Sequence, residues 1–200
     1  MTIGRTKFIP TLLLLAAGLL AVPAGAANYE VDNAHSTVGF TVRHLAISKT
    51  RGSFPDFTAT FVYEKGNPAA WSCQAVIQTA SVDTGNEKRD EHLRSPDFFN
   101  VEKFPSMTFK STATSMATAT EGALTGELTI AGVTRTVTLD LEFLGEIVDP
   151  WGNPRAGFVA NGTINRKEFG LNYNKAMETG GLVVGDEVQI SLEIEGIQAK

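Results

Sequence analysis

Apolar and polar residues alternate one by one along much of the chain after residue 30. Along His35–His44, the side chains of Val38, Phe40 and Val42 would share one face of an extended chain. The same alternation marks residues 57–63, 107–112, 123–130, 136–143, 156–164 and 188–195, and a further strand is expected at 71–76. A repeat of two residues is typical of half-buried antiparallel strands. The chain is therefore predicted to be all-β.

Turn sequences separate these segments, for example KGNP at 65–68 and DPWGNP at 149–154. About eight strands follow one another without the spacing of βαβ units and without an internal repeat. The pattern predicts one domain, built either as an antiparallel barrel or as a two-sheet sandwich.

The N-terminal segment 1–26 is interpreted as a secretory signal peptide. Arg5 and Lys7 precede the apolar run at 11–22, and the small residues Ala24-Gly25-Ala26 follow it. Twelve apolar residues are too few to cross a bilayer, which takes roughly 20. We expect cleavage after Ala26 or Ala27, a periplasmic or secreted protein, and no stable membrane insertion.

Residues 27–200 are expected to form the single mature domain. Without Arg5 and Lys7, the chain keeps 15 basic residues against 22 acidic ones, a formal charge of −7. A chain of this charge repels nucleic acid and anionic lipid, so neither is an expected partner. Cys73 is the single cysteine, which excludes an internal disulfide and is typical of a small buried apolar residue.

The alternation breaks at residues 84–100. Thr84-Gly-Asn-Glu87 fits a capping box and predicts a short helix that ends at Arg94, and Ser95-Pro96 predicts a second helix start. The first helix would carry one apolar residue, Leu93, which is too few for a core element. We expect this insertion, around residues 86–99, to lie over a surface or an opening.

Catalytic and metal-binding patterns are weak in this sequence. His35, His44 and His92 are far apart and include no closely spaced pair of the kind that zinc sites use. There is no GxSxG nucleophile motif. Asp90 and Glu91 are neighbours on the predicted helix and would point about 100° apart, away from a shared substrate. We predict neither catalytic residues nor a metal site.

Several segments resemble the YceI family of bacterial exported proteins. The most specific match is Arg89-Asp90-x-His92-Leu93 with the following Phe98-Phe99. The resemblance extends over YEVDNAHSTVGFTVRHLAISKTRGSF (29–54), ASVDTGNEKRDEHLRSPDFFNVEKFPSMTFKST (80–112), GELTIAGVTRTVTLDLEF (126–143) and INRKEFGL (164–171). It implies an extended eight-stranded antiparallel lipocalin-like barrel with the short helical insertion. It also implies a homodimer, a long-chain lipid in the interior, no established catalysis and a link to stress responses. Cys73 departs from the family pattern.

The preferred hypothesis is an exported, non-catalytic protein that holds a long-chain isoprenoid or similar amphiphilic lipid. Polyprenyl phosphate, an isoprenoid quinone and a fatty-acid amide are the candidate ligands, with a role in transport, storage or stress response. No cofactor besides this lipid is expected. The candidate tunnel residues are Phe40, Val42, Phe57, Phe61, Phe109, Leu128, Leu139, Leu141, Phe143 and Phe158. Arg89, His92 and His44 are the candidate partners of a polar head group at the mouth.

Two other hypotheses stay open. The first is a lipid-modifying enzyme that uses Arg89, Asp90 and His92. The second is a barrel filled by its own side chains, which acts through its surface as a stress-related interaction protein. An eight-stranded barrel is just wide enough for either side chains or one slender ligand, so the sequence alone does not separate the second hypothesis from the preferred one.

Overall fold

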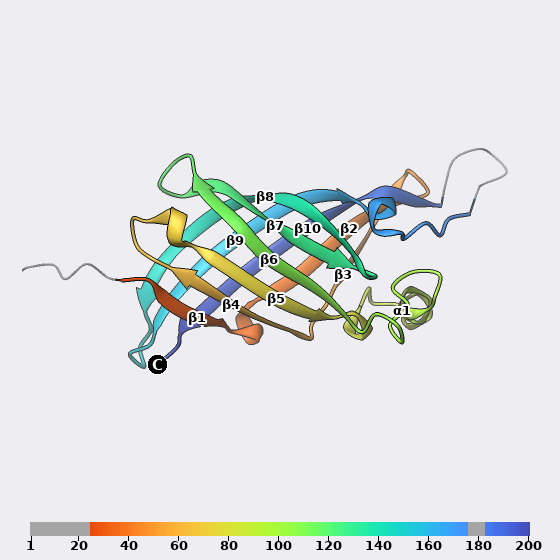
Figure 1. The fold of residues 1–200 in the computed structure, drawn as a ribbon. Coiled ribbons are helices and arrows are strands. Elements are labelled where there is room, and N and C mark those ends of the chain that lie inside the picture. The colour runs from red at the N-terminus through yellow and green to blue at the C-terminus, as the bar shows by residue number, and fades with distance from the viewer. Residues whose placement is uncertain (1–24, 176–182) are drawn as a thin grey trace, which may run out of the picture.

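A closed antiparallel barrel dominates the computed structural model, which describes residues 25–175 and 183–200. Over these residues ten strands form one sheet (Figure 1). The strands are β1 (Ala27–Val31), β2 (Thr37–His44), β3 (Ser48–Ser53), β4 (Phe57–Tyr63), β5 (Ser72–Gln78), β6 (Ser106–Met116), β7 (Glu121–Ile130), β8 (Val133–Val148), β9 (Pro154–Asn165) and β10 (Val184–Gln198). The helices are η1 (Asn33–His35), η2 (Pro68–Ala70), η3 (Thr79–Ser81), α1 (Glu87–Arg94) and η4 (Arg166–Phe169).

The strand order is β1-β4-β5-β6-β7-β8-β9-β10, and β1 pairs again with β10 to close the ring. Strands β1 and β2 both pair with β10, so together they fill one position of the barrel wall. Strands β3 and β4 fill the next position, because β3 pairs with β2 and β4 with β1. The ten described strands therefore make eight positions. This confirms the predicted eight-stranded antiparallel barrel, and the structure is not a sandwich.

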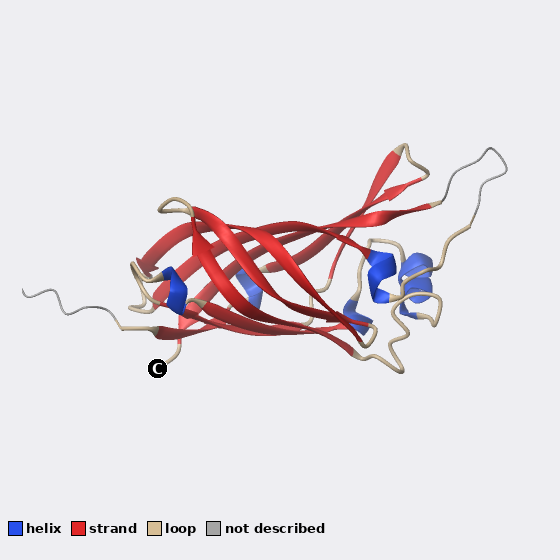
Figure 2. Ribbon diagram, turned by 45° about the horizontal axis from the view of Figure 1, so that its top comes forward, coloured by secondary structure: helices blue, strands red, loops and turns tan. Residues whose placement is uncertain are grey.

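The predicted alternation determines which side chains enter the barrel. In β4, Phe57, Phe61 and Tyr63 are buried, whereas Thr58 and Thr60 are exposed. The inward residues gather in two clusters along the barrel axis. We call the end near α1 and η4 the helical end, and the end near the start of β1 and the C-terminus the terminal end (Figure 1 and Figure 2).

The insertion between β5 and β6 differs in detail from the prediction. The α1 helix is capped by Asn86, whose side-chain oxygen accepts from Arg89 N at 3.1 Å, and not by Thr84. The second helix predicted at Ser95-Pro96 is a set of turns instead. Phe99 N donates to Leu93 O at 3.0 Å, which turns the chain back toward the barrel.

Residues 79–105, which we call the lid, are attached to the barrel wall by backbone and ring contacts. Ser53 and Asp83 exchange two backbone hydrogen bonds of 2.8 and 2.9 Å. Arg94 donates to the carbonyl oxygens of Ala80 and Val82 at 2.7 and 3.0 Å, inside the lid. The ring of Phe99 lies edge-on to Phe54, with centroids 5.5 Å apart. The lid therefore sits at the helical end as part of the fold.

Strand β8 extends beyond its predicted end at residue 143. Gly145, with φ of 135°, marks a register shift that interrupts the alternation. The added residues and the following turn carry exposed apolar side chains, namely Leu144, Ile147, Val148 and Trp151.

Residues 1–24 of the predicted signal peptide lie outside the described residues. Among the described residues, the structure has no helix that is both long and apolar enough to span a membrane.

Candidate binding cavity

A cavity of about 270 Å³ lies inside the barrel, lined by members of both clusters. Its wall consists almost entirely of apolar side chains. The volume lies just below the range of ~300–1,000 Å³ that is typical of ligand pockets. The barrel is therefore not completely filled by its own side chains, and this counts against the filled-barrel hypothesis.

Nine of the predicted tunnel residues line this cavity from strands all around the barrel. They are Phe40, Val42, Phe57, Phe61, Phe109, Leu128, Leu139, Leu141 and Phe158. Phe54, Trp71 and Met107 also line it, although the sequence did not single them out. Met107 shares the inward face of the predicted strand 107–112, so the alternation could have found it. Phe54 and Trp71 flank strands and carry no periodic signal.

Six aromatic rings close the terminal end in two layers. The first layer faces the cavity and consists of Phe61, Trp71 and Phe158; we call it the aromatic floor. The second layer consists of Tyr29, Tyr63 and Phe143, which pack behind the floor at centroid distances of 4.9–6.2 Å from their neighbours. Phe143, predicted to line the tunnel, therefore contacts the rings of the floor from behind.

The second layer ends in hydroxyl groups near a carboxylate. Burial and, to a smaller extent, the negative charge of Glu146 together raise the pKa of Tyr63 to about 12. Glu146 in turn forms an ion pair with Lys65. The hydroxyl groups of Tyr29 and Tyr63 therefore stay neutral at neutral pH, so the second layer of rings adds no charge beside the apolar cavity.

At the helical end, Leu93, Phe98 and Phe99 of the lid line the cavity. They are half-buried, whereas Phe57 and Leu128 on the wall are buried. Phe98 and Phe99 could either pack the insertion onto the barrel or touch a ligand. In the structure their rings pack the insertion onto the barrel, and they also line the cavity, where a ligand would contact them.

Arg89, a predicted head-group partner, is held by its own loop. Its Nε and Nη2 donate to the Thr84 hydroxyl and carbonyl oxygens at 2.7 and 2.8 Å. The Thr84 hydroxyl donates onward to the buried carboxylate of Asp90. The guanidinium is exposed and lies outside the cavity lining. Asp90 thus positions Thr84, and through it Arg89.

His92 and His44 also lie beside the cavity lining and not in it. His92 Nε2 is 2.8 Å from Asp97 Oδ2, and its ring packs edge-on against Phe98 and Tyr173. His44 ends β2, opposite Val184 of the cavity wall. The structure does not bring these residues together with Arg89 around one point, and a role in binding a head group stays a prediction.

Arg166 is a charged side chain in the lining, and it is 4% exposed. Its Nε donates to Gly185 O at 2.8 Å, and Nη1 donates to the carbonyl oxygens of Leu171 and Tyr173. Burial lowers its pKa, and the nearby Asp186 opposes that shift. These bonds join η4 to the start of β10, so we assign Arg166 a structural role.

Cys73 belongs to the cavity wall, where it pairs with Phe61 across β4 and β5. Its backbone N–H donates to the Ser111 hydroxyl at 2.8 Å. Burial raises the pKa of the thiol to about 11, which keeps it protonated at neutral pH.

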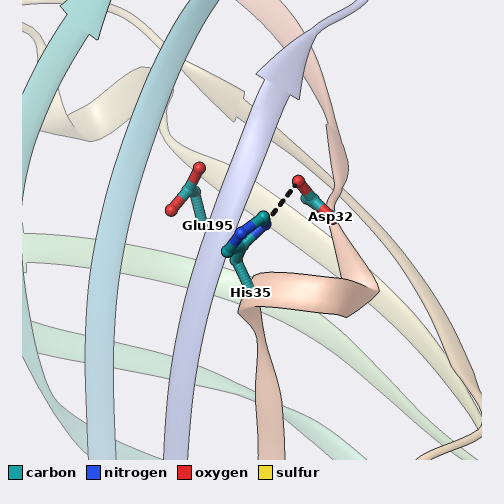
Figure 3. A group of neighbouring side chains, drawn as sticks. All are labelled: Asp32, His35 and Glu195. Carbon is teal, nitrogen blue, oxygen red and sulfur yellow. Dashed lines mark hydrogen bonds and ion pairs between the residues drawn. The ribbon is translucent and has the colours of Figure 1, made fainter. Parts of the chain in front are cut away.

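Among the described residues, one group could by its spacing hold a metal ion: Asp32, His35 and Glu195 (Figure 3). The His35 Nδ1 atom lies 2.9 Å from Asp32 Oδ2. Arg155 Nη1 lies 2.9 Å from the same oxygen and also contacts Glu195 Oε1. His35 first, and then Arg155, lowers the pKa of Asp32. Because the Arg155 guanidinium already contacts both carboxylates and would repel a metal cation placed between them, the group is better explained as an ion-pair network than as a metal site.

Comparisons with known proteins agree with this architecture. The sequence model of the YceI-like domain matches residues 29–196. The UPF0312 protein YE1254 of Yersinia enterocolitica is 42% identical over an alignment of 199 positions that covers 96% of this chain and 100% of the relative. The crystal structure of Burkholderia cenocepacia BcnA superposes with a TM-score of 0.73 at 28% identity, covering 82% of this chain and 98% of that one. A polyisoprenoid binding domain from Saccharophagus degradans shares the fold, with a TM-score of 0.60 at 15% identity over 89% of this chain and 100% of the domain.

Proposed function

The chain belongs to the YceI-like family, and on that basis we propose that it is an exported, non-catalytic protein that holds a long-chain lipid inside its barrel. The ligand is an isoprenoid or similar amphiphilic chain, and the role is transport, storage or a part in stress response. No cofactor besides the lipid is required. The observation that carries the proposal is the apolar cavity inside a closed barrel, with an aromatic floor at one end.

The energetics favour a hydrocarbon chain. Burying about fifteen methylene groups at ~0.8 kcal/mol each gives a gross gain of ~12 kcal/mol. Ordering and association cost several kcal/mol, which still leaves micromolar or tighter binding. A chain can therefore be held by the wall alone. The fold shared with a domain described as polyisoprenoid-binding supports the same class of ligand.

The direct test is native mass spectrometry of protein purified from its own host. We expect a bound mass that dissociates in organic solvent and is identified as a long-chain lipid. A protein that arrives empty and also fails to bind isoprenoid quinone and polyprenyl probes would rule the proposal out. Leu139→Trp, which places a large ring in the cavity, is the matched control and should bind at least tenfold more weakly.

A second candidate is a lipid-modifying enzyme that uses Arg89, Asp90 and His92. In its favour, His92 packs against Phe98, a residue of the cavity wall. Against it, Asp90 is buried and bonded to Thr84, and Arg89 is exposed. Incubation of the wild type with its own lipid should leave the lipid mass unchanged. A new product, lost in His92→Ala while the lipid still binds, would favour the enzyme.

Export and self-association complete the proposal. Cleavage after Ala26 or Ala27 would give a mature N-terminus that intact-mass measurement identifies. The homodimer is an expectation with a physical candidate, the exposed apolar end of β8 around Ile147. Sedimentation analysis of the wild type and of Ile147→Lys tests it, and a wild type that stays monomeric would exclude the dimer.

A further inference from the structure

We propose that the aromatic floor, formed by Phe61, Trp71 and Phe158, is an end stop that sets the maximum length of the chain the cavity accepts. This rests on the proposed function and adds to it a specificity: the apolar tail points to the floor and the polar end to the lid. The ligand class is then a single unbranched or isoprenoid chain of limited length.

The three rings of the floor come from three separate segments of the barrel wall and meet across its interior. Phe61 lies on β4, Trp71 directly precedes β5, and Phe158 lies on β9, on the other side of the ring. Phe158 packs edge-on to Phe61 at a centroid distance of 5.3 Å and to Trp71 at 5.6 Å. Rings in contact from opposite walls leave no passage for a chain between them.

The second layer of rings and the contacts around it hold the floor rings in place. Tyr29 stacks on Phe61 with centroids 4.9 Å apart and an interplanar angle of 3°. A Cβ atom on Gly196 would lie 2.3 Å from the Phe61 ring, so this ring lies directly against bare backbone. Trp71 Nε1 donates to Glu64 O at 2.7 Å, which fixes the indole. A tail that reached the floor could therefore go farther only by displacing packed rings.

The two ends of the cavity differ in how exposed their residues are, and this difference gives a bound lipid chain a preferred orientation. Phe61 and Trp71 of the floor, and Tyr29 and Tyr63 behind it, are buried, whereas Leu93, Phe98 and Phe99 at the lid are half-buried. Phe158 of the floor is half-buried as well. The wall between them is a ring of hydrogen-bonded strands. A polar end group keeps its hydration only at the lid, because burying an unpaired polar group in the apolar interior is unfavourable.

The test is a homologous series of saturated fatty-acid amides, with affinity measured by native mass spectrometry or isothermal titration. While added carbons enter the cavity, each methylene should tighten binding about fourfold, which is ~0.8 kcal/mol. At the length where the tail meets the floor, we expect this gain to stop. A gain that continues through the whole series would overturn the end stop.

Two variants move the floor in opposite directions. Ala160 lines the cavity two residues closer to the helical end than Phe158 on the same strand, about one layer or ~6.6 Å away. Ala160→Phe should shift the break to shorter chains, and Phe158→Ala should shift it to longer ones. Thermal unfolding checks that each variant folds, and Ala160→Leu is the substitute if Ala160→Phe does not.

Controls separate the two proposals. Val76→Ala, on the outer face of the barrel, should keep both the affinities and the break. Phe98→Ala in the lid should weaken all chain lengths by a similar factor without moving the break. If the wild type binds no chain of any length, the lipid-binding proposal fails. If it binds chains but the break stays fixed in both Ala160→Phe and Phe158→Ala, the end stop alone is wrong.

Discussion

The thiol of Cys73 shows how strongly the cavity changes the chemistry of one residue. Burial raises its pKa to about 11, and its neighbours include the aromatic floor residue Phe61. At neutral pH the thiolate is therefore scarce, and the thiol is a packing group of the wall.

We predict that iodoacetamide labels folded Cys73 slowly at pH 7 and faster as the pH rises toward 11, because the thiolate is the reactive form. A bound lipid should slow labelling further, since it covers the wall. Intact-mass spectrometry over time measures both effects. Unfolded protein, labelled fully at pH 8, is the control, and rapid labelling of the folded, lipid-loaded protein would contradict the prediction.

Asp149 is held at the β8–β9 turn by several donors. Burial works to raise its pKa, but the Arg155 guanidinium and the donors of Asn153 and Trp151 together lower it well below its usual range. A carboxylate whose pKa is lowered on folding stabilises the folded state above its unfolded pKa of about 3.9. That contribution is lost as the pH falls below this value.

We therefore expect the melting temperature of the wild type to drop as the pH is lowered from about 5 to about 2.5. Asp149→Asn should melt lower than the wild type at pH 7 and lose less over the same acid range. Circular dichroism melts at several pH values measure this. Identical acid losses in both proteins would show that the Asp149 ion pair does not contribute.

Side-chain direction in the lid could not be predicted from sequence. The resemblance placed Arg89 and His92 correctly on α1, but their partners Thr84 and Asp97 depend on how the flanking turns fold. Because α1 carries a single apolar residue, packing against the barrel does not fix the direction in which its charged side chains point.

At the scale of elements, the lid depends on a single N-cap. The Asn86 side chain accepts the Arg89 N–H, and α1 is only 8 residues long. Isolated helices of this length are marginal in water, so capping and contacts with the barrel decide whether α1 forms.

Asn86→Ala should cost the helix about 1 kcal/mol. We expect faster hydrogen exchange in α1 and faster lipid release, with little change in the exchange of β9 and β10. Hydrogen–deuterium exchange and a lipid-transfer assay measure these effects. Lys88→Ala, an exposed substitution on the same helix, is the matched control, and equal exchange in both variants would contradict a role for the cap.

Strand prediction succeeded where one face is buried and failed elsewhere. Strand β3, Ser48–Ser53, has no apolar side chain, because it pairs along β2 beyond the main core and has no inward hydrophobic face to signal it. The last residues of β8 were missed because the register shift at Gly145 breaks the period of two. Hydrophobic periodicity reports burial, and therefore only those strand segments that are buried on one side.

At the scale of the whole molecule, closure of the barrel turns these alternating faces into a wall. The eight positions and the inward residues followed from the pattern and the resemblance. The cavity could not be predicted in this way, because its volume depends on how stacked rings, such as Tyr63 on Phe143, occupy the interior. The sequence therefore predicts which residues form the core but not the volume that remains unfilled between them.

Leu139→Trp tests that space directly. Leu139 is buried in the cavity wall, and a larger side chain there can enter the cavity instead of the packed core. We expect lipid binding to fall at least tenfold while the melting temperature changes little. In a filled barrel the same change would overpack the core and cost about 1–3 kcal/mol. Leu139→Met, which conserves volume, should retain binding.

The positions of Trp71 and Trp151, the two tryptophans of the chain, give the molecule an optical signal of its own. Trp71 faces the cavity, whereas Trp151 is 80% exposed at the β8–β9 turn. Emission near the blue end of the tryptophan range then comes from Trp71, and a quinone guest in the cavity would quench that component first. With Trp151→Phe, fluorescence would follow the filling and emptying of the barrel in real time without any attached dye.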